Sequence, residues 1–130
     1  ITCWGTGNPL REFLFVDDLA DACLFALEKW DSIDSNSPQD KFGNKLYWLN
    51  VGSNSEITIK EVVEKIAHYI GYEGQILWDT SKPDGTPRKK LDNSRMKNLG
   101  WESKTDLDLG IKLTLKSYED EIKQNKLRTL

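Results

Sequence analysis

The sequence has few of the residues on which disulfide frameworks, metal sites and basic nucleic-acid surfaces depend. Its 130 residues include two cysteines and one histidine. Cys3 and Cys23 stand far apart without a C-x-x-C pair, which argues against a disulfide framework and against a metal-ligand cluster. The net charge is −3, and the sequence pI is near 5.2. Nucleic-acid binding requires clustered basic residues and a high pI, so we expect no nucleic-acid partner.

Membrane and export signals are also missing from the sequence. No apolar run approaches the ~18 residues that a membrane span needs, and no signal peptide is recognisable, so we expect a cytoplasmic protein. A chain of 130 residues is long enough for one domain with a core and too short for a complete two-domain enzyme. The first residue is not Met, and residues 1–4 are typical of the interior of a strand. This start predicts a fragment or a processed product.

Short strands and helices alternate along the chain, which predicts an α/β fold with a thin sheet. Strands are expected over residues 1–4, 11–15, 46–51 and 75–79, and helices over 16–30, 58–70, 95–99 and 105–122. We expect one region, 1–130, with an exposed loop at 31–44, a second loop at 80–90 and a frayed tail at 123–130.

Local helix-end signals support several of these boundaries. Thr58 and Glu61 form a capping box, and residues 105–108 offer a second capping pattern. Asp17 and Asp18 occupy the first turn of the first helix, where the helix dipole favours acidic side chains. We therefore interpret this pair as a helix start and not as catalytic carboxylates.

Apolar residues recur at helical spacing in the first helix, and we expect their stripe to face a core. The stripe consists of Val16, Leu19, Ala20, Cys23, Leu24, Leu27 and Trp30. Phe25 lies opposite it, the 46–51 strand is apolar on both faces, and Leu109 and Leu113 lie off the stripe of the last helix. These competing faces predict a large apolar surface meant for another domain, with Trp48 or Phe25 exposed or in an intermolecular contact. We also expect self-association into a homo-oligomer.

The loop 81–90, S-K-P-D-G-T-P-R-K-K, is the most informative segment for function. Its two prolines and the Asp84–Gly85 turn display the polar side chains in a fixed geometry. Its four cations are Lys82, Arg88, Lys89 and Lys90. Such a set can hold a diphosphate, and Asp84 can accept hydrogen bonds from sugar or ribose hydroxyls. The alternative is a solvated surface loop with incidental charge.

A second candidate segment lies at residues 4–11. Trp4 and Arg11 flank a glycine-rich turn, which suggests an aromatic wall beside an anion clamp. Gly5 and Gly7 do not form a dinucleotide fingerprint, because no third spaced glycine opens a helix. The segment therefore predicts substrate contacts and no cofactor loop.

The other reactive side chains have simpler interpretations. His68 lies on the side of its helix opposite the apolar stripe and is expected to be solvated. Cys3 has no nearby base, and Cys23 falls on the predicted core face. The chain shows no nucleophile with a base and no metal-ligand spacing. We therefore expect no catalytic, cofactor-binding or metal-binding residue in it.

The candidate segments resemble the C-terminal part of the GDP-L-fucose synthases, a family of extended short-chain dehydrogenase/reductases. The pattern W-G-x-G…R-x-F…V-x-D over residues 4–18 is shared by many nucleotide-sugar epimerases, and L-N-V-G at 49–52 is similarly general. The K-P-D-G-T-P-R-K of residues 82–89 is more specific to the fucose synthases, as are L-D at 91–92 and L-G-W at 99–101. The resemblance extends to about residue 118.

The resemblance implies a substrate-binding C-terminal part whose Rossmann half is missing. Family members convert GDP-4-keto-6-deoxy-D-mannose to GDP-L-fucose by 3,5-epimerisation and NADPH-dependent reduction at C4. The implied GDP-sugar contacts are Trp4, Arg11, Asp84 and Arg88 or Lys89. The family's cofactor loop, its Ser/Tyr/Lys set and its Cys/His pair match nothing in this sequence. The chain alone is therefore expected to bind no NADPH and to be inactive.

Three alternatives remain open. The chain can be a stand-alone nucleotide-sugar-binding module, a folded dimerisation fragment, or part of an epimerase or dehydratase acting on another nucleotide sugar. The K-P-D-G-T-P-R-K loop argues against the last of these.

Overall fold

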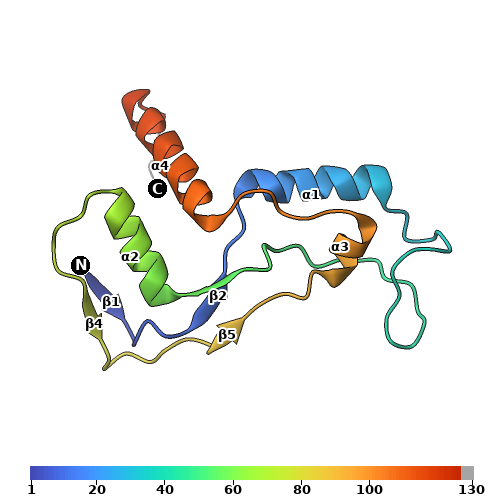
Figure 1. Cartoon of the computed structure of the whole chain (residues 1–130), viewed down its shortest axis with the longest axis horizontal. Coiled ribbons are helices and arrows are strands. Elements are labelled where there is room, and N and C mark those ends of the chain that lie inside the picture. Colours follow the sequence, from blue (N-terminus) through green and yellow to red (C-terminus); the bar gives the residue numbers. More distant parts are fainter. Residues whose placement is uncertain (127–130) are drawn as a thin grey trace. The chain divides into compact units, whose positions relative to one another are not determined.

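The computed structural model describes residues 1–126 and confirms the mixed α/β class (Figure 1). The elements are β1 (Thr2–Trp4), β2 (Leu10–Glu12), α1 (Val16–Lys29), β3 (Glu56–Thr58), α2 (Ile59–Tyr69), β4 (Leu77–Asp79), β5 (Arg88–Lys89), α3 (Ser94–Leu99) and α4 (Leu107–Lys123). The chain folds into two compact units, each made of separate segments. The first unit contains residues 1–11, 57–88 and 106–130, and the second contains 12–56 and 89–105.

The strands form two small sheets. β1 and β4 pair in parallel, with Thr2 opposite Leu77 and Trp4 opposite Asp79. A three-stranded sheet has the order β3-β2-β5. The chain passes from one unit to the other within each of these three strands.

In the first unit, helices α2 and α4 pack against each other. The predicted capping box is confirmed: the Glu61 amide donates to the Thr58 hydroxyl at 3.1 Å, and the Thr58 amide donates to the Glu61 carboxylate at 2.9 Å. α4 starts differently from the prediction, because Asp106 caps it by accepting from the Leu109 amide at 2.8 Å.

The second unit has a core built around Met96 and Trp101 from the segment that follows β5. Ala22 of α1 completes the buried cluster, and Leu14, Phe25, Leu49, Val51 and Leu99 pack around it. The Trp101 indole N–H donates to Asp21 at 2.9 Å and, ahead of the Lys104 ammonium, holds the pKa of that carboxyl below its usual range.

Asp18 does more than begin a helix. It is 6% exposed and accepts hydrogen bonds from the Thr105 amide at 2.9 Å and the Thr105 hydroxyl at 3.2 Å. The N-cap of α1 is Phe15, which makes no side-chain cap. The interpretation of Asp18 as a helix-start residue was therefore incomplete, since its carboxylate ties α1 to residues 104–105.

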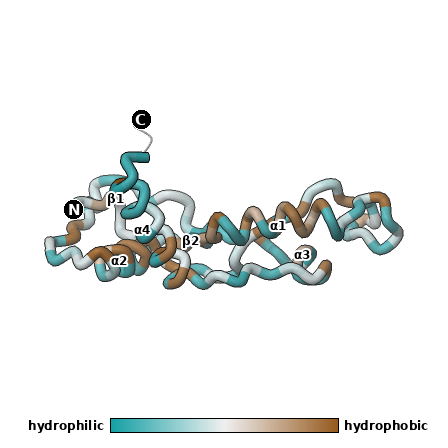
Figure 2. The backbone as a smooth tube through the Cα atoms, turned by 90° about the horizontal axis from the view of Figure 1, so that it is seen from above, coloured by the Kyte–Doolittle hydropathy of each residue, from teal (hydrophilic) through white to brown (hydrophobic). Residues whose placement is uncertain are grey.

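The predicted core stripe of α1 was wrong. Val16 is 67%, Leu24 61% and Leu27 83% exposed, and Cys23 is exposed as well. Figure 2 shows hydrophobic residues along much of α1. The buried side of α1 carries Asp18 and Ala22. Hydrogen bonds from Trp101 to Asp21 and from Thr105 to Asp18 hold this side of the helix against residues 101–105.

The predicted strand at 46–51 was also wrong. Within residues 1–126 this segment forms no strand, because its only nearby pairing is an isolated bridge between Gln39 and Lys45. Leu46 is buried, whereas Tyr47 is 66% and Trp48 69% exposed. The expected exposure of Trp48 is thus confirmed, while Phe25 packs against the core.

Smaller differences from the prediction concern the limits of one strand and the extent of one loop. The expected strand 11–15 is β2, Leu10–Glu12, and the short strand β5 lies inside the predicted loop 80–90. After α4, the amides of Asn125 and Lys126 donate to Ile122 and Glu121 at 3.0 and 2.9 Å. Residues 127–130 of the predicted frayed tail lie outside the described residues. Over the described part of the chain, no helix has both the length and the apolar character that a bilayer crossing requires.

Candidate functional site

The two candidate segments lie side by side in the first unit. We call residues 4–11 the turn segment and residues 80–88 the proline loop. Two backbone hydrogen bonds of 2.9 Å join them and the end of β4: Gly5 N–H to Asp79 O, and Leu10 N–H to Pro87 O. The segments that the sequence singled out separately are therefore adjacent in the fold.

Asp84 fastens the proline loop to the turn segment. Its carboxylate accepts from the Thr6 amide at 2.7 Å and from the Thr6 hydroxyl at 2.6 Å. These bonds, the hydroxyl first, hold the pKa of Asp84 below its usual range. Gly5 has φ +80°, and a Cβ there would collide with the Asp84 carboxylate. Glycine is therefore needed at position 5 for this close approach.

Arg11 lies along the backbone of the proline loop. Its Nη1 donates to Leu10 O at 2.6 Å and to Thr86 O at 2.7 Å. A Cβ on Gly85 would lie 3.1 Å from Nη2, so the glycine leaves room for the guanidinium. No carboxylate within residues 1–126 forms a salt bridge with Arg11. Its charge is held in place by carbonyls and remains available to an anion.

Trp4 ends β1 with a side chain that is 74% exposed. The Lys82 ammonium lies 5.8 Å from the centroid of its ring, within the range of a cation–π contact. An exposed aromatic face beside a cation can accept a planar base and a neighbouring phosphate.

The remaining candidates come from β5. Arg88 and Lys89 are both exposed; Arg88 is the last residue of the proline loop, and Lys89 begins the second unit. The structure thus brings Trp4, Arg11 and Asp84 onto one surface, with Arg88 directly after Pro87. Lys90, the fourth predicted cation, lies 3.8 Å from Glu56 in the second unit.

Sequence reasoning missed Thr6, the partner of Asp84, and Glu12, which is hydrogen-bonded to three later residues. A hydroxyl residue between two glycines was a usable signal for Thr6. No local pattern indicates Glu12, since its partners lie 42 or more residues away.

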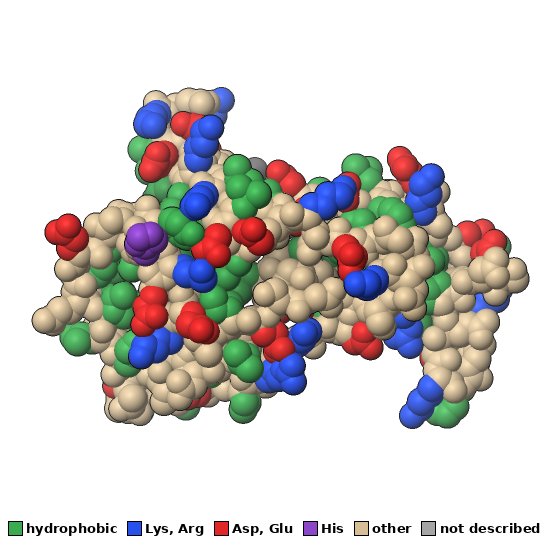
Figure 3. All heavy atoms as spheres, in the orientation of Figure 1, with side chains coloured by type: hydrophobic (Ala, Val, Ile, Leu, Met, Phe, Trp, Pro, Cys, Tyr) green, Lys and Arg blue, Asp and Glu red, His purple; other side chains and the backbone are tan. Residues whose placement is uncertain are grey.

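A hollow in the first unit, away from the candidate segments, has a volume of about 360 Å³ and lies beside His68. There Asp108 accepts from Lys65 Nζ at 2.8 Å and from the Tyr69 hydroxyl at 2.5 Å. The pKa of Asp108 is lowered by Lys65 and then Tyr69, while the bond to Asp108 raises the pKa of Tyr69. We interpret this cluster as a link between α2 and α4. On the face shown in Figure 3, acidic and basic side chains are interspersed.

Acidification should weaken the contact between Asp84 and Thr6. The depressed pKa of Asp84 stabilises the fold above about pH 4, the ordinary range of an aspartate, and this contribution is lost as the pH falls through the folded-state pKa. In melting curves between about pH 6 and pH 2, Asp84→Asn should flatten the acid-side decline in melting temperature. The exposed substitution Glu119→Gln in α4 is the control. Unchanged pH dependence in Asp84→Asn would contradict the assignment.

Comparison with known proteins shows which proteins this chain is similar to. The model of the NAD dependent epimerase/dehydratase family matches residues 1–40. A putative GDP-L-fucose synthase 2 of Arabidopsis thaliana is 42% identical over 126 residues, which cover 97% of this chain and 34% of the relative. The GDP-L-fucose synthase of Escherichia coli K12 is 40% identical over 114 residues, covering 88% of this chain and 34% of the relative.

Solved structures agree with these relatives. A GDP-mannoheptose C4 reductase from Campylobacter jejuni with NADP bound is 32% identical, with a TM-score of 0.72, and the match covers 92% of this chain and 34% of that one. The chain is thus homologous, over most of its length, to one segment of the GDP-L-fucose synthases and related GDP-sugar reductases. It spans about a third of the length of the curated relatives that it matches.

Proposed function

We propose that this chain is the GDP-sugar-binding part of a GDP-L-fucose synthase. The observation that carries the proposal is the pairing of the turn segment with the proline loop, which brings together the exposed Trp4 ring and the cations Lys82 and Arg11. The homology to GDP-L-fucose synthases extends through both segments. The order of the proline loop does not distinguish a structural role from diphosphate binding, because the loop would be ordered in both cases. The two roles differ at Arg11, since only diphosphate binding needs an arginine without a carboxylate partner.

Each candidate residue has a distinct proposed role. The Trp4 ring packs against the nucleotide, and Lys82, which lies over it, contributes positive charge. Arg11 and Arg88, with Lys89, bind the diphosphate. Asp84 fixes the proline loop through Thr6. The remaining lone pairs of its carboxylate oxygens would accept hydrogen bonds from sugar or ribose hydroxyls.

The whole protein, in this proposal, converts GDP-4-keto-6-deoxy-D-mannose to GDP-L-fucose with NADPH in the cytoplasm. The epimerising, reducing and cofactor-binding groups belong to an N-terminal Rossmann half, and the present chain alone is inactive and binds no NADPH. The exposed apolar side chains Leu24, Leu27 and Trp48 support a docking partner, either that half or a second copy in a homo-oligomer.

Removing the guanidinium of Arg11 should weaken GDP-sugar binding by about 10- to 100-fold, the equivalent of one or two charge-assisted hydrogen bonds. Titration calorimetry of the full chain with GDP-mannose measures this loss for Arg11→Ala and for Arg88→Ala. Arg95→Ala, which removes an arginine from α3 of the second unit, is the matched control and should bind normally.

A second titration tests the nucleotide preference. UDP-glucose should bind more weakly than GDP-mannose to the unsubstituted chain. Binding of GDP-mannose that is absent, or that is equally reduced by Arg95→Ala, would contradict the proposed function.

A further inference from the structure

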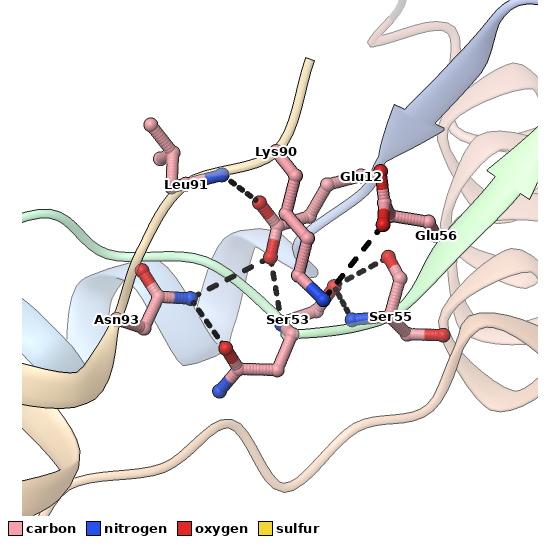
Figure 4. A network of polar contacts seen from close by, with 8 residues as sticks. Glu12, Ser53, Ser55, Glu56, Lys90, Leu91 and Asn93 are labelled. Atoms are coloured by element: carbon pink, nitrogen blue, oxygen red, sulfur yellow. Dashed lines mark hydrogen bonds and ion pairs between the residues drawn. The ribbon is translucent and has the colours of Figure 1, made fainter. Parts of the chain in front are cut away.

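We propose that Glu12 is a positioning residue for the GDP-sugar site and that it acts by holding the chain on both sides of β2. The inference rests on the proposed function and extends it to a residue that has no assigned contact with the ligand. Figure 4 shows the Glu12 carboxylate in a polar network that also contains Asn93 and Leu91. All members of this network belong to the second unit.

The two oxygens of the Glu12 carboxylate accept from two distant chain segments. Oε1 accepts from the Asn54 amide at 2.6 Å, and Oε2 accepts from the Leu91 amide at 3.0 Å. Asn54 precedes β3 by two residues, and Leu91 follows β5 by two residues. β2 is the middle strand of this sheet, with β3 on one side and β5 on the other. The carboxylate at the end of β2 therefore links the segment before β3 to the segment after β5.

Close packing holds the carboxylate in place. Asn93 is 3% exposed, and its Nδ2 lies 3.5 Å from Glu12 Oε1 and 3.4 Å from Asn54 Oδ1. A Cβ on Gly52 would lie 2.6 Å from Glu12 Oε1 and 2.7 Å from Asn93 Nδ2. The Gly52 position therefore accepts no side chain unless the carboxylate moves.

Three of the proposed ligand contacts are close to the network in the sequence. Arg11 immediately precedes Glu12 in the chain, and Arg88 and Lys89 precede Leu91 by three and two residues. Side chains alternate along a strand, so Arg11 and Glu12 extend from opposite faces of β2. Glu12 can thus fix the backbone while Arg11 remains directed at the proline loop. Ligand-binding side chains require such support, because misplacement beyond ~0.5 Å weakens a binding site.

A carboxylate is required for this bridging role. Glutamine has nearly the same shape, but it has only one acceptor oxygen and its amide nitrogen is a donor. In Glu12→Gln, one of the two backbone amides, that of Asn54 or that of Leu91, would lose its acceptor and face another donor. The substitution therefore removes one of the two hydrogen bonds that link Asn54 and Leu91 through Glu12, with little change in side-chain volume.

The experiment is titration of the full chain with GDP-mannose. Glu12→Gln should raise the Kd up to about tenfold, because displaced arginine side chains would lose part of a charge-assisted contact with the diphosphate. Hydrogen exchange at the Asn54 and Leu91 amides should become faster in the same variant. Glu28→Gln, the same chemical change at an exposed position of α1, is the control and should change neither measurement.

A double substitution separates positioning from general destabilisation. Because the proposal has Glu12 act in part through Arg88, Glu12→Gln should have a smaller effect on the Kd in an Arg88→Ala background than in the unsubstituted chain. Multiplicative effects would overturn the inference, because a loss of folded protein reduces binding by the same factor in either background. Gly52→Ala, which displaces the carboxylate but keeps its charge, gives a second test if Glu12→Gln does not fold, and it should also weaken binding.

The outcomes distinguish this inference from the function on which it rests. If the unsubstituted chain binds GDP-mannose and Glu12→Gln and Gly52→Ala bind equally well, the positioning role is wrong and the proposed function stands. If the unsubstituted chain does not bind, both are wrong.

Discussion

Replacing Trp101 with alanine should lower the free energy of unfolding by about 3–5 kcal/mol, the usual cost of truncating a buried aromatic residue. Trp101 is 4% exposed and packs with Ala22 and Met96 in the core of the second unit. The substitution leaves a cavity and also removes the indole N–H that donates to Asp21. A loss of this size is comparable to a large part of the ~5–15 kcal/mol that stabilises a typical domain.

Trp48 provides a matched control for this experiment. It is 69% exposed, so Trp48→Ala should change the free energy of unfolding by less than about 0.5 kcal/mol. Urea denaturation followed by circular dichroism measures both variants. Similar losses for the two substitutions would show that the core is not centred on Trp101.

Gly7→Ala should cost about 2–5 kcal/mol of stability, because two separate penalties combine. Gly7 has φ +77°, a conformation that disfavours any side chain. Its added Cβ would lie 2.7 Å from the Trp78 ring and 2.9 Å from Lys60 Cβ. Because the Gly7 carbonyl accepts from the Lys60 amide at 2.9 Å, the substitution should also disturb the turn segment and weaken GDP-mannose binding.

Gly71 isolates the backbone penalty from the steric one. It has φ +66°, but a Cβ there would meet no atom within 4 Å. Gly71→Ala should therefore cost only about 1–2 kcal/mol and leave binding unchanged. Thermal and urea denaturation of the two variants give the comparison. A loss for Gly71→Ala as large as that for Gly7→Ala would contradict the close packing around Gly7.

Helix boundaries could be predicted because they depend on neighbouring residues. The Thr58–Glu61 capping box lies within one turn, and Gly100 has the positive φ of 104° that its position at the end of α3 requires. Such signals need no knowledge of the rest of the fold. The positions of α1, α2 and α3 were accordingly predicted to within one or two residues.

The direction of the α1 face could not be predicted in the same way. Hydrophobic periodicity shows that a helix has an apolar stripe, but it does not identify the partner of that stripe. Here Asp18 and Asp21 bind residues more than 79 positions later, and these polar bonds turn the apolar stripe outward. The strand expected at 46–51 failed for a related reason, since a strand exists only where another backbone pairs with it.

The residues of the candidate site could be predicted from the sequence, but their hydrogen-bond partners could not. Rigid turns and clustered cations marked Trp4, Arg11 and the proline loop as candidates, and the first unit places them on one surface. The contacts of Asp84 with Thr6, and of Glu12 with backbone amides, depend on where those amides lie in space. No motif in the sequence encodes such an arrangement.

The interleaving of the two units has a consequence for synthesis on the ribosome. The second unit is complete in sequence at residue 105, whereas the first still requires residues 106–130. In the first unit, β1 cannot pair until β4, about 75 positions later, has been synthesised, and α2 cannot pack until α4 has been synthesised. Because chains emerge from the N-terminus onward, the second unit can fold before the first unit is fully synthesised. Premature termination before α4 would therefore yield a product with a complete second unit and an incomplete first unit.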